Sequence, residues 1–145
     1  MNPDTELQQL AEEFRESLRQ ALYIARHMDA DTDLSATQVS ILKMAAGDGM
    51  RVSEIARNLG VRVPSATEQI IRLEKAGLLL RSPDPKDSRG VRVTLAEDGP
   101  GRLAAANAAR TALMSQLLEK LTEDERQVLA AALPVIGRLN TLPRS

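Results

Sequence analysis

The sequence of 145 residues lacks cysteine and tryptophan, and it contains one histidine and only two aromatic residues. Without cysteine, the chain cannot form a disulfide, a thiolate zinc site, a cysteine nucleophile or a thiol redox switch. The two aromatics, Phe14 and Tyr23, are too few for single-strand nucleic-acid modules of the RRM or OB type, which stack bases on several aromatic side chains. If this chain binds nucleic acid, we therefore expect it to read a duplex.

Long hydrophobic runs are also missing. No stretch of about 18 consecutive apolar residues occurs, and the N-terminal residues have neither the basic nor the apolar region of a secretory signal. We therefore expect a cytoplasmic protein with no membrane partner. Hydrophobic residues make up 43% and charged residues 27%, which is typical of one globular domain, and the 21 leucines and 20 alanines favour a mainly α fold.

Catalytic and metal-binding motifs are absent from the sequence as well. It contains neither a G-x-S-x-G elbow nor a glycine-rich phosphate loop, and His27 has no nucleophile with which the sequence could pair it. Asp29, Asp31 and Asp33 alternate without the glycine and the distant glutamate of a calcium loop. We therefore expect no enzyme activity, no cofactor and no metal.

Charge is unevenly distributed along the chain. The net charge is -1, yet residues 51–95 contain nine Lys or Arg against five Asp or Glu, while the rest has an excess of acids. A basic segment between acidic ends is typical of a protein that meets a polyanion, although a solvated surface explains a modest excess equally well.

Helical periodicity and capping residues predict four helices in the first half of the chain. Ser35 with Gln38 forms a capping-box pattern, Pro64 suits the first turn of a helix, and Gly60 and Gly77 are typical helix ends. The expected limits are Leu7 to Met28, Ser35 to Ala46, Ser53 to Leu59, and Pro64 to Gly77.

After the fourth helix, the spacing of apolar residues changes from helical to strand-like. Residues 78–80 and 91–95 have the short, partly alternating pattern of strands, and the ten residues between them predict a hairpin with a long tip. Helical spacing returns after Gly101. Thr122 with Glu125 forms a second capping box, which opens a last helix that Pro134 is expected to kink.

Helices followed by a hairpin in this order are typical of a winged helix-turn-helix, whose last helix enters the major groove while the hairpin tip reaches beside it. The fourth helix is amphipathic. One face gathers Ala66, Ile70, Leu73 and Gly77, and the opposite face gathers Pro64, Ser65, Glu68, Arg72 and Lys75. On that polar face, Glu68 can accept a hydrogen bond from a cytosine amino group or pair with Arg72 four residues later.

The hairpin carries the most specific motif. Residues 84–89 read Asp-Pro-Lys-Asp-Ser-Arg before a strand that ends at Leu95, which resembles the D-x-x-D-x-R wing of the MarR family of bacterial transcription regulators. Residues 34–42, 52–56 and 72–78 are similar to other segments of that family, and the match spans residues 34–99. Two departures are Ala96, where the family often has threonine, and Glu68, where many members carry a basic or polar residue.

The resemblance implies a set of DNA-binding residues on the fourth helix and the hairpin. Arg89 is implied to enter the minor groove, where narrow A/T-rich sequence concentrates negative potential, and Asp87 is implied to brace it. A turn-stabilising ion pair between Asp87 and Arg89 is the alternative. The implied set is Arg62, Pro64, Ser65, Thr67, Glu68, Gln69, Arg72, Lys86, Asp87 and Arg89.

The resemblance also implies a homodimer, built from an N-terminal helix in residues 1–33 and C-terminal helices in residues 100–145. Two copies would place their reading helices about one duplex turn, roughly 34 to 36 Å, apart on a pseudo-palindromic operator. A monomer whose end helices fold back on the winged region is the alternative. The apolar residues expected in the dimer contact are Leu7, Leu10, Phe14, Leu117, Leu121, Leu133 and Ile136.

Many members of that family bind a small aromatic or acidic ligand. In this chain, only Tyr23 and His27, four residues apart on one helix face, are candidates for such a contact, and a structural or exposed histidine is the alternative. We therefore expect a dimeric transcriptional repressor that binds double-stranded DNA. A winged-helix module used for protein interaction or DNA architecture is the alternative. The 15 arginines against four lysines suggest a GC-rich bacterial source.

Overall fold

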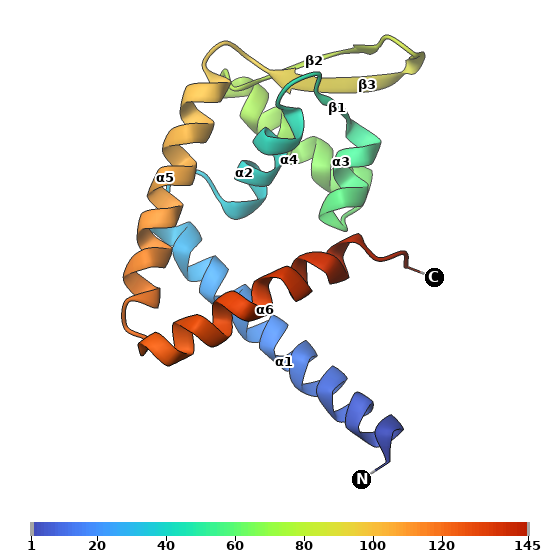
Figure 1. Cartoon of the computed structure of the whole chain (residues 1–145). Coiled ribbons are helices and arrows are strands. Elements are labelled where there is room, and N and C mark those ends of the chain that lie inside the picture. Colours follow the sequence, from blue (N-terminus) through green and yellow to red (C-terminus); the bar gives the residue numbers. More distant parts are fainter. Residues whose placement is uncertain (1, 145) are drawn as a thin grey trace. The chain divides into compact units, whose positions relative to one another are not determined.

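The computed structural model describes residues 2–144, which divide into two compact units, one ending at Ala109 and the other beginning at Arg110. Figure 1 shows the elements along the chain. They are α1 (Pro3–Ala30), α2 (Ala36–Ala45), β1 (Met50–Arg51), α3 (Val52–Leu59), α4 (Val63–Lys75), β2 (Leu79–Asp84), β3 (Asp87–Leu95), α5 (Gly99–Leu118) and α6 (Glu123–Thr141).

The first four helices have the predicted order and nearly the predicted limits. The capping box before α2 is confirmed, because Ser35 Oγ accepts a hydrogen bond from the Gln38 amide at 3.1 Å and Gln38 Oε1 accepts one from the Ser35 amide at 3.0 Å. Helix α3 ends at Gly60, whose φ of 69° lies in the left-handed region that favours glycine. No helix among residues 2–144 combines the length and the apolar character needed to cross a membrane.

The sheet differs from the sequence prediction in two ways. Its strands are antiparallel in the order β1-β3-β2, and β1, which pairs Met50 with Val93, is too short to be visible as a sequence period. The hairpin strands are longer than expected, and only Pro85 and Lys86 separate them. The predicted ten-residue tip is therefore wrong. Pro83 marked this stretch as a loop, yet it lies in β2 at the edge of the sheet, where a residue without an amide proton is tolerated.

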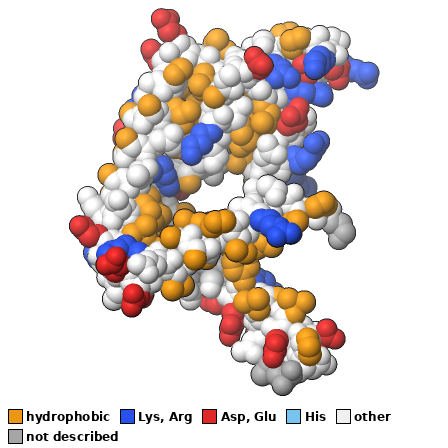
Figure 2. Space-filling view, viewed as in Figure 1, with side chains coloured by type: hydrophobic (Ala, Val, Ile, Leu, Met, Phe, Trp, Pro, Cys, Tyr) orange, Lys and Arg blue, Asp and Glu red, His pale blue; other side chains and the backbone are white. Residues whose placement is uncertain are grey.

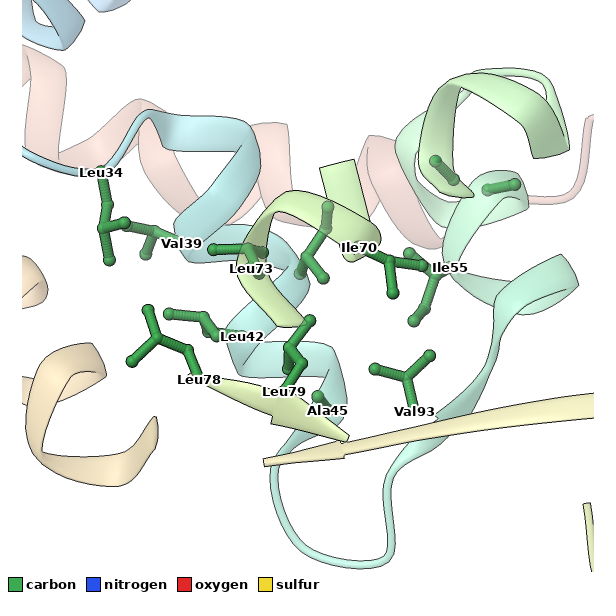
Figure 3. Packing of buried hydrophobic residues seen from close by; sticks show 13 residues of the cluster. Leu34, Val39, Leu42, Ala45, Ile55, Ile70, Leu73, Leu78, Leu79 and Val93 are labelled. Carbon is green, nitrogen blue, oxygen red and sulfur yellow. The ribbon is translucent and has the colours of Figure 1, made fainter. Parts of the chain in front are cut away.

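A hydrophobic core joins α2, α3 and α4 to the sheet. In Figure 3, Ile55 of α3 and Ile70 of α4 lie next to each other, and Val93 points toward them from β3. Ile55, Ile70 and Val93 are fully buried. Burial of this amphipathic face fixes which side of α4 faces solvent.

The predicted apolar face of α4 is confirmed for Ala66, Ile70 and Leu73, which are buried. Gly77 does not belong to it. It lies beyond the end of α4, is exposed and has a φ of 80°, so it turns the chain toward β2 instead of packing in the core. The fold is therefore mainly α with a small antiparallel sheet, and its winged helix-turn-helix lies between α1 and α5.

Helix α5 begins at Gly99, three residues earlier than predicted, and the Arg102 amide donates to the Asp98 carbonyl at 3.2 Å. In the second unit, the predicted capping box of α6 is confirmed by hydrogen bonds between Thr122 and Glu125 in both directions. Helix α6 continues past Pro134, and its kink stays a prediction. None of the side chains described between residues 110 and 144 is buried.

Candidate nucleic-acid interface

The exposed face of α4 carries the polar residues predicted for DNA reading. Because the opposite face is held in the core, Ser65, Glu68 and Arg72 are exposed, and Thr67 and Gln69 are partly buried. Arg62 is the N-cap residue and Pro64 lies in the first turn; both are exposed. The fold thus exposes Ser65, Glu68 and Arg72 on one face, while Thr67 and Gln69 lie at its margins.

Glu68 pairs with Arg72 along this face. The Arg72 Nη2 atom donates to Glu68 Oε1 at 2.9 Å, and both side chains are more than half exposed. An exposed ion pair at this spacing stabilises a helix only slightly, so it can open at little cost when a base or phosphate offers another partner. The salt-bridge interpretation of Glu68 is thus correct for the unbound chain, and a base contact stays a prediction.

The first turn of α4 has no side-chain cap. Arg62 provides no side-chain hydrogen bond to the first turn, and the Ser65 amide donates only to the Arg62 carbonyl at 3.0 Å. Pro64 has no amide proton and the Ala66 amide also donates to the Arg62 carbonyl, at 3.2 Å, so this end favours an anionic partner such as a DNA phosphate mainly through the partial positive charge of the helix N-terminus.

The wing tip presents Arg89 to solvent. The Arg89 amide donates to Asp87 Oδ1 at 3.0 Å, while its guanidinium Nε lies 4.0 Å from the same oxygen and its side chain is 96% exposed. Asp87 therefore fixes the backbone of the tip and leaves the guanidinium accessible. Lys86 in the turn is exposed as well, and Figure 2 shows basic side chains gathered at this end of the hairpin.

Behind the tip lies a charged cluster that the sequence analysis did not assign. The side chain of Asp84 is only 2% exposed, and its carboxylate lies 3.0 Å from Arg51 Nε and 3.5 Å from Arg92 Nε. The Arg92 guanidinium also donates to the carbonyls of Asp48 and Gly49 at 3.2 and 3.1 Å. The cluster connects both wing strands to the segment that precedes α3.

The surroundings of Asp84 favour its ionised form. A hydrogen bond from the Lys86 amide, at 3.2 Å, is the main cause that lowers the pKa of Asp84, and the charges of Arg92 and Arg51 lower it further against the opposing effect of burial. The D-x-x-D spacing could have identified Asp84, since the motif contains both aspartates. Arg51 and Arg92 belong to other segments, which only the folded chain brings to the motif.

Tyr23 and His27 interact with their own helix. The Nδ1 atom of His27 lies 2.7 Å from the Tyr23 carbonyl oxygen, and the Arg19 guanidinium donates to the Tyr23 hydroxyl at 2.9 Å. Both side chains are exposed. These contacts account for the two side chains within α1, and their role in ligand binding stays a prediction.

The residues predicted for the dimer contact lie on the surface of the single chain. On α1, Leu7 is 66% exposed, Leu10 is similarly exposed and Phe14 is partly buried. In the second unit, the side chains of Leu117, Leu133 and Ile136 are exposed, and Leu121 is partly buried. Each of these helices therefore has apolar side chains that the isolated chain does not cover.

The sequence of this chain is similar to those of known transcriptional regulators. A family model described as "MarR family" matches residues 34–91. An HTH-type transcriptional regulator of Mycobacterium tuberculosis is 33% identical over 108 residues, which cover 74% of this chain and 76% of that protein. The HTH-type transcriptional repressor MdtR of Bacillus subtilis is 34% identical over 76 residues, which cover 52% of this chain and 49% of MdtR.

A comparison by structure agrees. The transcriptional repressor CouR, solved bound to a 23-mer DNA duplex, superposes with a TM-score of 0.69 at 29% identity. The superposition covers 88% of this chain and 94% of the CouR chain. The likeness therefore extends from the sequence motifs to nearly the whole fold.

Proposed function

Since this chain belongs to the MarR family of DNA-binding transcriptional regulators, we propose that two copies form a dimer that represses transcription from a pseudo-palindromic operator. Members of this family are regulators and not enzymes. The exposed residues of α4 read the major groove, and Arg89 reads the adjacent minor groove.

One observation carries this proposal: the winged region presents two separate exposed basic elements. Arg72 on α4 offers a guanidinium that an exposed ion pair holds loosely, and Arg89 at the wing tip is almost completely solvent-accessible. Major-groove and minor-groove contacts require such a helix and hairpin tip in one rigid body. The shared core of α4 and β3 provides that rigidity.

The exposed apolar residues of α1, α5 and α6 support the dimer. In this arrangement, residues 1–33 and 100–145 provide the dimer contact and residues 34–99 contact the operator. Burial of leucines such as Leu7 and Leu133 against a second copy removes apolar surface from water. The two-fold symmetry of that contact makes the operator pseudo-palindromic, with half-sites about 10 base pairs apart.

Repression follows from occupancy of the operator, which blocks access of the polymerase. The similarity to CouR and MdtR, both described as transcriptional repressors, supports this direction of control. A small aromatic or acidic ligand relieves repression by changing the spacing of the two reading helices. Tyr23 and His27 on α1 are the candidate contacts for that ligand.

The experiment is binding of the purified protein to a fluorescent duplex that carries the region upstream of its own gene, with random duplex as competitor at two salt concentrations. Tight binding that resists competition and falls steeply with salt is the expected result. Equal, weak binding to all duplexes would indicate that the operator lies elsewhere or that the protein is architectural. A complete lack of salt-sensitive binding would indicate a protein-interaction module.

A further inference from the structure

A groove separates the wing from the beginnings of α3 and α4. Its volume is about 290 Å³, and it lies entirely within the unit that ends at Ala109. Among the described residues, its lining contains three arginines and two hydroxyl side chains but no acid. The lining residues are Arg51, Val52, Ser53, Val63, Thr67, Arg81, Arg89, Gly90 and Val91.

The three arginines are not equivalent. Arg81 is paired with Glu74 of α4 at 3.0 Å. Arg89 extends from the wing tip into solvent. Arg51 is the one that the surrounding structure holds in a defined place, with its side chain 35% exposed.

Two carboxylates and a glycine determine the position of Arg51. Its Nε lies 3.0 Å from Asp84, and its Nη2 donates to Asp87 at 3.5 Å. The guanidinium lies across Gly90, where an added Cβ would come within 2.8 Å of Arg51 Nη2. A guanidinium has five N–H donors, and these two contacts leave others for a partner in the groove.

The backbone at this place adds positive potential. Arg51 is the N-cap residue of α3 but provides no side-chain hydrogen bond to the first turn, which begins with Val52 and Ser53. The first amides of α3 therefore retain donor capacity beside the guanidinium and the Ser53 hydroxyl. Guanidinium, hydroxyl and amide donors together suit the oxygens of a phosphate.

We propose that Arg51 binds a phosphate of the DNA backbone in this groove, with the hydroxyls of Ser53 and Thr67 as further donors. This inference rests on the proposed function, since the phosphate belongs to the operator that α4 and Arg89 read. Arg51 adds a backbone contact between the segment read by α4 and the segment read by Arg89. This contact carries no sequence information but fixes the register of the protein on the duplex.

The test combines variants with operator duplexes in which single phosphates are replaced, one position at a time, by neutral methylphosphonates. For the wild type, one position in each half-site should weaken binding by about tenfold, because a charge-assisted hydrogen bond is lost there. Arg51→Gln should bind the native duplex about as weakly as the wild type binds the modified one. A methylphosphonate at that position should not weaken the binding of Arg51→Gln further. The salt dependence of its binding should fall by about one ion per half-site.

Two further variants distinguish a phosphate contact by Arg51 from a structural role of Arg51 in holding the wing. Arg51→Lys keeps the charge and should restore part of the sensitivity to that one phosphate. Arg26→Gln removes an exposed arginine of α1 instead and should respond to every methylphosphonate like the wild type. A purely structural role of Arg51 would weaken binding without coupling to any single phosphate.

The outcomes distinguish this inference from the proposed function. If wild type and Arg51→Gln lose the same factor at every methylphosphonate, the phosphate contact is wrong while the DNA regulator stands. If the wild type binds no duplex, both the phosphate contact and the proposed function are wrong.

Discussion

Arg51 Nε lies 3.0 Å from Asp84 Oδ2, which connects the N-cap residue of α3 to the last residue of strand β2. The same arginine reaches Asp87, whose other oxygen accepts from the Arg89 amide. The backbone that carries Arg89 is therefore connected, through two carboxylates and one guanidinium, to the helices that position α4. The positions of α4 and of the wing tip are thus geometrically coupled, which would couple the proposed reading of the two grooves.

Asp84→Asn tests this connection. Asparagine keeps the size of the side chain and an oxygen for the Lys86 amide, but it removes the charge that holds Arg51 and Arg92. We expect faster hydrogen exchange at the tip amides and a loss of operator affinity of about tenfold, since the tip is no longer preorganised. Asp33→Asn is the control, because its pair with Arg102 is exposed and 3.7 Å long. Unchanged exchange in Asp84→Asn would contradict the bracing role.

The pKa of Asp84 gives a second prediction. The Lys86 amide, together with Arg92 and Arg51, holds this pKa below its ordinary value, so the folded chain binds the Asp84 proton less tightly than the unfolded chain does. Its contribution to stability is complete at pH above the ordinary range of an aspartate and is lost as pH falls through the lowered pKa. Urea unfolding of wild type and Asp84→Asn at several pH values should show a difference that is constant near neutrality and shrinks in acid. A difference that stays constant into strong acid would refute this assignment.

Arg89→Ala and Lys86→Ala should separate minor-groove reading from charge alone. Both side chains are exposed at the tip, so neither change should alter the melting temperature. Arg89→Ala should weaken binding by about tenfold and abolish the preference for A/T-rich flanking sequence. Lys86→Ala should weaken binding to all duplexes about equally. Fluorescence anisotropy with A/T-rich and G/C-rich flanks measures both effects, and equal behaviour of the two variants would exclude the minor-groove assignment.

Ile70 connects the stability of the core to the presentation of α4. It is fully buried next to Ile55, on the side of α4 opposite to Arg72. Ile70→Ala should lower the free energy of unfolding by about 2 to 5 kcal/mol, because it loses buried apolar contacts and leaves a cavity. Leu80→Ala, at a side chain 55% exposed, should cost much less. Denaturant unfolding measures both variants, and equal losses would show that Ile70 is not a core residue.

The parts of the structure that could be predicted from sequence are those that short-range patterns determine. The capping boxes at Ser35 and Thr122 involve residues three apart, and the burial of Ala66, Ile70 and Leu73 follows from the helical period of α4; these were predicted and confirmed. The wing motif identified Asp87 and Arg89 because the turn they form is local.

What sequence reasoning missed depends on long-range pairing. Strand β1 has only two residues and exists because β3 pairs with it across more than forty positions of sequence. The prolines in the hairpin suggested a loop, whereas pairing with β3 extends β2 to Asp84. The same pairing brings Arg51 to Asp84, so the cluster behind the tip has no signature in any single segment.

Leu117→Asp tests the proposed dimer. Leu117 is exposed in the single chain, so an aspartate there should leave the fold of one copy intact, whereas a charge buried between two copies without a partner is costly. We expect sedimentation equilibrium to show a dimer for the wild type and mainly monomer for Leu117→Asp, with a loss of tight operator binding because the two half-sites are no longer read together. Gln116→Asp is the control, since it adds the same charge at an exposed polar position next to Leu117 and should remain dimeric. A wild type that sediments as a monomer would refute the dimer, and a dimeric Leu117→Asp would remove Leu117 from the contact.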